Sequence, residues 1–491
     1  MLIVLPAGTA FAQDSDTLFI AKTLRDQTKL KKSMELLEAY HKTHPNDLYT
    51  NWIYAQVAYQ ARRFRLSVDL FNHAVTLSPN DNVLRLDYAK CLVNTGNFMK
   101  ADAELKRLTS IDISNPEPWY YLAKIEYWKG EHKNALALLE NLLLNIPEYV
   151  PAQLLRDQIQ KDLSLWLSLD FSYASDDQPM KILTTALRGG WYRSNHMGLD
   201  FQFNKPLVLR DSGNFSALGF SIGNKFHFSR ANVTIYLNLG LFRHTSQNST
   251  GWTGDLKIEK GLLRKLSVWA EIQRKPYIST LTSLQLPLFE NHLTFAASLN
   301  DPDHWNGRLS YEGSTFSSDK NYITAICGWI FVPAMKTGRF DFHLGYGYNY
   351  STAKESRFAS EKTLSDILVN WDLNVPVTGI YNPYFTPKDQ QVHSLLTTIN
   401  FRVSRTLIFS VNVNGGVFAT TRYPYLYLDK DASDSVMIMS SFIYKTFFPV
   451  TVNAGMNWDI SKTLEMLLQF NYNSTIYYSM HTTGITIRKR F

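Results

Sequence analysis

Residues 340–350 read FDFHLGYGYNY, and the alternation in this stretch decides the class of fold. Large apolar or aromatic side chains occupy every second position, and small, polar or charged side chains occupy the positions between them. Successive side chains of a β-strand point to opposite faces of the sheet, so this strand has one apolar and one polar face. The apolar set is Phe340, Phe342, Leu344, Tyr346, Tyr348 and Tyr350, and the other set is Asp341, His343, Gly345, Gly347 and Asn349.

The same period of two residues recurs between residue 163 and the C-terminus. It is clear in residues 197–204, 232–242 and 409–417. A soluble β-sandwich also alternates and is the competing interpretation, but it seldom places tyrosine at strand ends so often. An apolar outer face, aromatic belts and a polar lumen are typical of a transmembrane β-barrel, which is the fold we expect for residues 163–491.

The length of this region predicts the number of strands. About 330 residues, at roughly 20 per strand and connection, give about 16 strands, with 14 to 18 as the expected range. Barrels of about this size enclose an aqueous channel. The longest expected connection, residues 352–391, is a candidate plug or gate. The last strand ends in Phe491, and a C-terminal aromatic residue on such a strand resembles the signal read by the outer-membrane insertion machinery.

Residues 14–162 have a different period, of 34 residues. In an array of helix hairpins, small residues lie where two helices cross closely, large apolar residues fill the space between units, and proline ends the second helix. We therefore expect about four stacked hairpins that resemble tetratricopeptide repeats, with residues 151–162 as a closing helix. The recurring positions are Ala21, Ala55, Ala89 and Ala123; Ser33, Ser67, Ala101 and Ala135; Leu37, Phe71, Leu105 and Leu139; and Pro45, Pro79 and Pro147. The chain is thus expected to be an α + β multidomain protein, an α-solenoid followed by an antiparallel barrel.

Composition narrows the function classes. Aromatic residues make up 14% of the chain and charged residues only 19%, which is unusual for a cytosolic enzyme. The net charge of +7 is spread along the chain, so nucleic-acid binding is not expected. Cys91 and Cys327 fall in different regions and lack metal-ligand spacing, so we expect no disulfide between them and no metal or other cofactor.

Residues 1–12 look like the end of a secretory signal, because a short apolar stretch is followed by Ala10-Phe11-Ala12. The alternative is a buried N-terminal strand. Nowhere else does an apolar run approach the roughly 20 residues of a spanning helix, so insertion into a membrane requires a barrel.

Several short motifs in the alternating region resemble a known family. Their order and spacing over roughly residues 265–420 are similar to those of the outer-membrane exporters of bacterial cellulose-synthase operons and, more loosely, of poly-N-acetylglucosamine export porins. The sequence departs from the family in three ways: Tyr277 stands where an acidic residue is expected, Thr386 replaces a serine, and the repeat array is short. The motifs are Arg274-Lys275-Pro276, Asn300-Asp301-Pro302, Trp305-Asn306-Gly307 with Gly313, Tyr384-Phe385-Thr386-Pro387 and Ser394-Leu395.

The resemblance implies a passive outer-membrane conduit for an exopolysaccharide, either cellulose-like or poly-N-acetylglucosamine-like. It places the helical repeats in the periplasm of a Gram-negative bacterium, where they would dock components of the synthesis machinery, and the barrel in outer-membrane lipid. A sugar polymer slides past many weak hydrogen bonds and stacking faces, and this requires no catalytic residue. The residues proposed to contact the polymer in the lumen or loops are Arg274, Asp301, Asp303, Trp305, Asn306 and Tyr384.

Two other classes of function compete with export. An enzyme would need a nucleophile, a histidine and an orienting acid, but neither His304 with Asp301 and Asp303 nor His393 with Ser394 has a recognised spacing. A barrel that serves as a scaffold or receptor, with repeats that bind partner proteins, shares every fold-level feature and stays open. The acids of residues 300–313 are instead expected in a turn at Asp301-Pro302-Asp303 and on one face of the strand that follows.

Overall fold

The computed structural model describes residues 8–491 apart from 179, 195–196, 210–212, 229–230, 264, 302–303, 370–376 and 431. Contacts divide the chain into two compact units, Met1–Asp162 and Leu163–Phe491. The segment expected to be a secretory signal, residues 1–12, lies in part outside the described residues, and its residues 8–12 fall within the first helix.

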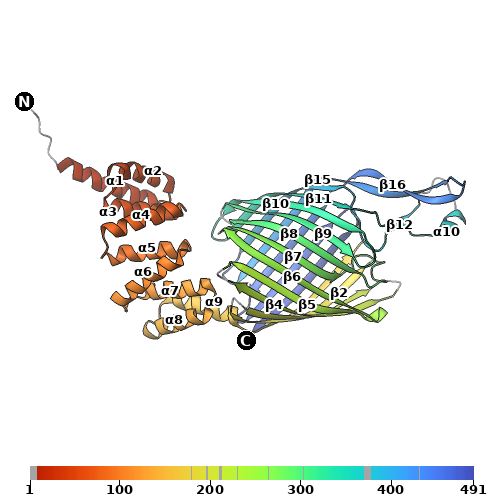
Figure 1. Ribbon diagram of the computed structural model, residues 1–491, viewed down its shortest axis with the longest axis horizontal. Helices are drawn as coiled ribbons and strands as arrows, with labels where there is room; N and C mark the ends of the chain where they lie inside the picture. Colours follow the sequence, from red (N-terminus) through yellow and green to blue (C-terminus); the bar gives the residue numbers. More distant parts are fainter. Residues whose placement is uncertain are drawn as a thin grey trace, which may run out of the picture. The chain divides into compact units, whose positions relative to one another are not determined.

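The first unit consists of helices that follow one another as hairpins (Figure 1). Eight of the described helices form four hairpins, and a ninth closes the array, as the 34-residue period predicted. Among the described residues, no helix combines the length and the apolar character needed to cross a membrane. The helices are α1 (Gly8–Asp26), α2 (Leu30–Thr43), α3 (Leu48–Gln60), α4 (Phe64–Leu77), α5 (Asn82–Asn94), α6 (Phe98–Ile111), α7 (Pro116–Lys129), α8 (His132–Asn145) and α9 (Val150–Leu163).

The recurring small residues of this unit lie where the two helices of a hairpin touch. The four alanines of the first set and the four small residues of the second set are all 0% exposed. In two hairpins the contact is a hydrogen bond: Ser33 Oγ donates to the carbonyl of Ala21 at 2.8 Å, and Ser67 Oγ donates to that of Ala55 at 2.8 Å. A larger side chain at these positions would separate the helices, because cores are close-packed.

Each hairpin after the first begins at a capped helix. Asp47, Asp81 and Asn115, again 34 residues apart, accept hydrogen bonds from backbone N–H groups in the first turns of α3, α5 and α7. These caps satisfy donors that the helix itself leaves unpaired. The repeat therefore specifies where helices begin as well as how they pack.

The turn inside each hairpin needs a left-handed residue, and only half of these positions are glycine. Gly96 and Gly130 have φ of 82° and 83°, whereas Thr28 and Arg62 at the equivalent positions have φ of 60°. A β-branched side chain is strained in this conformation. We expect Thr28→Gly to stabilise the helical unit by about 1 kcal/mol, a rise in its unfolding midpoint of about 2–4 °C.

The measurement is thermal unfolding of the full-length protein, followed by the circular dichroism of its helices. Thr109→Gly in the regular helix α6 is the control, and it should instead destabilise by about 0.3 kcal/mol. A destabilised Thr28→Gly variant would contradict this account of the turn.

The second unit is one antiparallel sheet that closes on itself (Figure 1). The first strand pairs with both the second and the last. In the described part of the chain the wall has sixteen strand positions, as predicted, because β16 and β17 lie end to end along one long strand, β15. The strands of the wall are β1 (Trp166–Asp176), β2 (Lys181–Ser194), β3 (Met197–Leu209), β4 (Phe215–Phe228), β5 (Val233–His244), β6 (Ser249–Leu263), β7 (Leu266–Pro276), β8 (Phe289–Asp301), β9 (Trp305–Phe316), β10 (Tyr322–Lys336), β11 (Phe340–Ala353), β14 (Gln390–Arg402), β15 (Leu407–Lys430), β16 (Val436–Thr446), β17 (Val450–Asp459), β18 (Leu464–Ser474) and β19 (Ser479–Arg490).

The two ends of the barrel differ in their connections. At the end where the chain joins β1, the connections between strands are two to four residues long. At the other end they include residues 277–288 and residues 354–389, which contain the short strands β12 (Phe358–Ser360) and β13 (Gly379–Tyr381) and the helix α10 (Leu364–Val369). We call these the short-turn end and the long-loop end.

Candidate functional site

Alternation along the strands separates an outer face from a lumen. Large apolar side chains in one alternate set are exposed, such as Leu309 at 61% and Leu241 at 57%. Apolar groups are exposed on this scale where a barrel faces lipid, so this set forms the outer face. The other set, which includes Asn306 and Arg308 on β9 and Tyr236 and Asn238 on β5, faces the lumen.

Aromatic and cationic side chains alternate around part of the lumen, on the strands from β4 to β10. The guanidinium of Arg308 lies over the rings of Trp269 and Trp329, at 5.2 and 5.8 Å from their centres. The Lys257 ammonium lies 4.5 Å from the centre of Trp269 and 5.7 Å from that of Tyr236. Each cation is held between aromatic faces, which fixes flexible side chains in place. We call Lys225, Tyr236, Lys257, Trp269, Arg308 and Trp329 the lumen belt.

Acids on the other side of the lumen are paired. Asp170 lies 3.3 Å from Arg188, and Glu465 lies 3.1 Å from Arg490. The Tyr192 hydroxyl donates to Asp200 at 2.9 Å, beside a cavity of about 250 Å³ lined by residues of β1 to β6. The wall thus carries many hydrogen-bonding groups that are already held by neighbours.

Residues 354–389 are the longest connection of the long-loop end, and we call their described part the lid; its stretch around Phe385 crosses the mouth of the barrel. The backbone N–H of Phe385 donates to the hydroxyl of Tyr277 at 3.3 Å, and its ring lies 5.4 Å from that of Tyr478. Tyr277 belongs to the β7–β8 connection and Tyr478 to the β18–β19 connection, eight strand positions apart in either direction around the wall. One lid residue therefore touches opposite sides of the mouth.

A buried tyrosine fixes the lid to the rim. Tyr384 is 0% exposed and stacks on Phe316, with ring centres 3.6 Å apart and planes 9° apart. Its hydroxyl donates to Asp319, whose carboxylate also accepts from Arg357 Nε at 2.9 Å. Burial raises the pKa of Tyr384 and that of Tyr277, so both hydroxyls stay neutral.

The structure separates the six residues that the sequence proposed as polymer contacts. Tyr384 lies in the lid. Arg274 lies near the long-loop end on the outer face, 4.8 Å from the ring centre of Trp252. Asp301 lies at the short-turn end, paired with Lys265 and 3.2 Å from His304. Asp303 lies outside the described residues.

Trp305 and Asn306 are neighbours in β9 and so face opposite ways. Trp305 is 51% exposed on the outer face, and Asn306 faces the lumen. The binding roles of all six residues stay predictions, and geometry favours only Asn306 for contact with a polymer in the lumen, because Tyr384 is fully buried. The lumen belt was missed from the sequence, although the alternation that assigned Tyr236 and Arg308 to the polar face was a usable signal.

The residues considered for catalysis have ordinary structural surroundings. His393 lies on the outer face, where its Nδ1 is 2.6 Å from the Tyr346 hydroxyl and its ring packs on Tyr348, while Ser394 points inward. Asp301 is occupied by Lys265 and His304 at a turn. Among the described residues, no group of three or more histidines, cysteines or acids is placed to hold a metal ion.

Comparisons with known proteins found similarity in structure alone. No family model matches the chain, and no curated protein matches it. A solved structure named "Bacterial polysaccharide outer membrane secretin" is 9% identical with a TM-score of 0.48 and covers 67% of this chain and 99% of its own. The tetratricopeptide-repeat protein YrrB, described as having an unusual peptide-binding site, is 13% identical with a TM-score of 0.27, covering 32% of this chain and 82% of its own. A thermophilic repeat protein of Thermus thermophilus is 17% identical with a TM-score of 0.26, covering 29% of this chain and 79% of its own.

Proposed function

We propose that this protein is an outer-membrane pore that exports an exopolysaccharide. The observation that carries the proposal is the barrel itself: sixteen strand positions enclose a lumen lined by the lumen belt and by paired polar groups, with a lid across one mouth. A barrel of this size encloses a channel. Aromatic faces can stack on sugar rings, and amide, hydroxyl and charged side chains can form hydrogen bonds with the hydroxyl groups of the sugar.

The connections give the direction of export. Outer-membrane barrels have short periplasmic turns and longer extracellular loops, so the short-turn end would face the periplasm and the lid the medium. The chain joins the barrel at the short-turn end, so on this proposal the helical repeats lie in the periplasm. The signal predicted at residues 1–12 accords with this location.

The repeats offer a surface for a protein of the synthesis machinery. A cavity of about 360 Å³ on the helical unit is lined by Arg25, Tyr59, Lys90 and Tyr121 among others. Lys124 lies nearby over the ring of Tyr121, and burial lowers the pKa of its ammonium. Asp87 also lines the cavity, and Arg25 and Lys90 are paired with Asp26 and Glu117. A surface of aromatic, polar and paired charged groups suits a peptide segment.

The test is secretion of polysaccharide from a strain that lacks the gene but keeps a functional polysaccharide synthase. Wild-type protein should restore polymer to the medium, whereas Trp269→Ala with Trp329→Ala should restore on the order of tenfold less, because two stacking faces are lost. The matched control is Trp252→Ala, whose ring is on the outer face and 58% exposed. Unchanged secretion in the deletion strain would rule out export.

The lid supports a second candidate. Because one lid residue already bridges opposite sides of the mouth, the barrel also suits a scaffold or receptor that does not transport and whose repeats bind partner proteins. Normal secretion in the deletion strain, together with loss of a periplasmic complex, would favour this candidate.

A further inference from the structure

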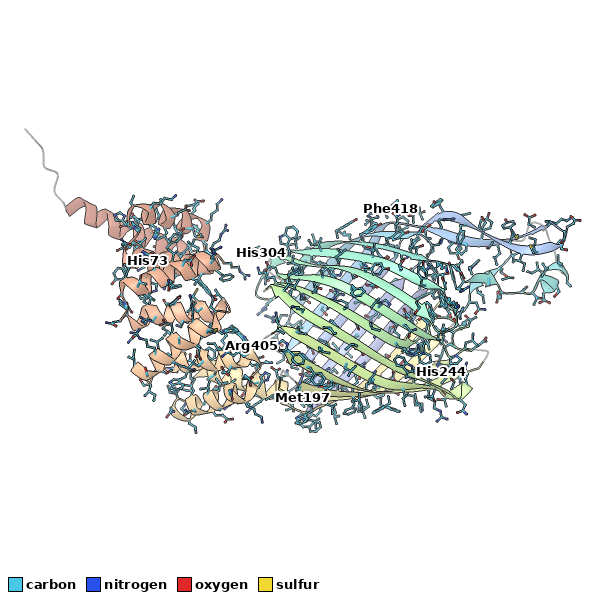
Figure 2. All side chains as sticks on the ribbon, in the orientation of Figure 1. His73, Met197, His244, His304, Arg405 and Phe418 are labelled. Carbon is cyan, nitrogen blue, oxygen red and sulfur yellow. The ribbon has the colours of Figure 1, made fainter. Side chains whose placement is uncertain are left out.

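One hairpin extends beyond the barrel wall. β15 is 24 residues long, and its pairing with β14 ends at Thr420. From Thr420 to Lys430 its opposite edge pairs with β16, so the two strands form a projecting hairpin (Figure 1). The hairpin leaves the wall near Phe418 (Figure 2).

The two faces of this hairpin have different surroundings. On one face Leu426 is only 5% exposed, and its backbone forms a bridge with Val377 of the lid. On the other face Tyr425 and Tyr427 are 40% and 36% exposed, and their ring centres lie 5.8 Å apart with planes inclined by 33°. Their cross-strand neighbours are Ser441 and Met439. We call Tyr425 and Tyr427 with these neighbours the tyrosine platform.

A series of ring contacts connects the mouth of the barrel to this hairpin. Phe385, which touches Tyr478 at the rim, lies 5.5 Å from Tyr381. Tyr381 lies 5.2 Å from Phe358, and Phe358 lies 6.1 Å from Tyr423, which shares a strand face with Tyr425 and Tyr427. The ring contacts therefore reach from the proposed exit of the pore to Tyr423, two residues before the platform in β15.

We propose that the tyrosine platform binds the polysaccharide chain as it leaves the mouth. This inference rests on the proposed export function. A pyranose ring presents C–H bonds on its flat face, and two neighbouring tyrosine rings match a stretch of such rings. Tyrosine suits this role because its ring is rigid and amphipathic and loses little entropy on binding. Ser441 and the two phenol groups can bond sugar hydroxyls.

The surroundings favour a polymer over a second copy of the chain. Copies of a sheet protein usually associate by adding strands at a free edge. The outer edge of β15 is already bridged by Val377, next to the platform. Among the described strands, β16 pairs only with β15. If two copies joined through the other edge of β16, the tyrosine face would stay as it is, so association of copies is tested separately.

The experiment measures binding of two probes, a β-1,4-linked glucose hexasaccharide and an N-acetylglucosamine hexasaccharide, to purified full-length protein by calorimetry. Tyr425→Ala with Tyr427→Ala should weaken binding of at least one probe by about tenfold, whereas the double phenylalanine variant, which keeps both rings, should retain most of it. The matched control is Tyr444→Ala, which removes an 83% exposed ring from the opposite face of the same hairpin.

Three results would overturn the proposal. The first is that neither probe binds the wild-type protein. The second is that the platform variant and the Tyr444 variant lose equal amounts of binding affinity. The third is that affinity falls in the variant with Trp269→Ala and Trp329→Ala and not in the platform variant, which would place binding in the lumen. Analytical sedimentation of the same samples tests whether the platform is an interface between two copies of the chain. In that case the wild-type protein would sediment as a dimer and the platform variant as a monomer. Binding to the platform is measured with purified protein, and export is measured as secretion by cells. A failure of the platform proposal can therefore be distinguished from a failure of the export proposal.

Discussion

Replacing residues 357–385 with a short glycine-serine linker is expected to increase ion conduction through the barrel. The replacement removes Phe385, which touches both Tyr277 and Tyr478, and Tyr384, which anchors the lid on Phe316 and Asp319. What remains is a barrel of sixteen strand positions, a size that encloses a water-filled lumen. Single-channel conductance in planar bilayers should rise on the order of tenfold.

A point variant gives a graded form of this result. Asp319→Ala leaves the Tyr384 hydroxyl and Arg357 without their shared acceptor, so the lid should detach intermittently and the channel should show brief openings. Val369→Ser is the control, because Val369 in the lid helix α10 is 81% exposed. Conductance that stays at the wild-type level after the replacement would contradict a pore closed by its lid.

Phe71→Ala is expected to cost the helical unit about 3–5 kcal/mol of stability. Phe71 is 2% exposed and packs near Tyr88 of the next hairpin, with ring centres 6.3 Å apart. Removing the ring leaves a cavity between two units, and stacked repeats are stable only through contact with their neighbours. A loss of this size is a large share of the roughly 5–15 kcal/mol that stabilises a typical domain.

The measurement is denaturant unfolding of the full-length protein, followed by the circular dichroism of its helices. Met99→Ala is the control, since Met99 is 90% exposed and its truncation should change stability little. If Phe71→Ala cost less than about 1 kcal/mol, the hairpins would not be coupled through this position.

The two units, and the face of the helix or strand on which many side chains lie, were predictable from the sequence. Both follow from sequence patterns between nearby residues or successive repeats. A 34-residue recurrence of small, large and proline residues repeats one packing unit, and Ser33 and Ser67 make the same hydrogen bond in successive copies. Alternation over two residues assigned Leu309 and Tyr311 to one face of β9 and Asn306 and Arg308 to the other. Both signals depend only on how a helix or strand orients neighbouring side chains.

The candidate site was less accessible to this reasoning. The short motifs drew attention to Arg274 and Trp305, which the barrel places on its outer face, and to Asp301, which is held in a turn by Lys265. Alternation assigned Trp305 and Asn306 to different faces, but it could not show that Trp269, Arg308 and Trp329 lie against one another. That contact depends on the register between strands, which the sequence of a single strand does not contain.

The sequence by itself determined a helical repeat array followed by a barrel of about sixteen strands, because both patterns follow from the spacing of side chains along the chain. Only the tertiary structure decided that the lid crosses the mouth, that β15 continues into a projecting hairpin, and that Tyr423 on this hairpin contacts Phe358 of the lid. Tyr277 and Phe385 are 108 residues apart in sequence. Such residues meet only because the sheet closes on itself and brings opposite loops over one opening, which no local pattern records.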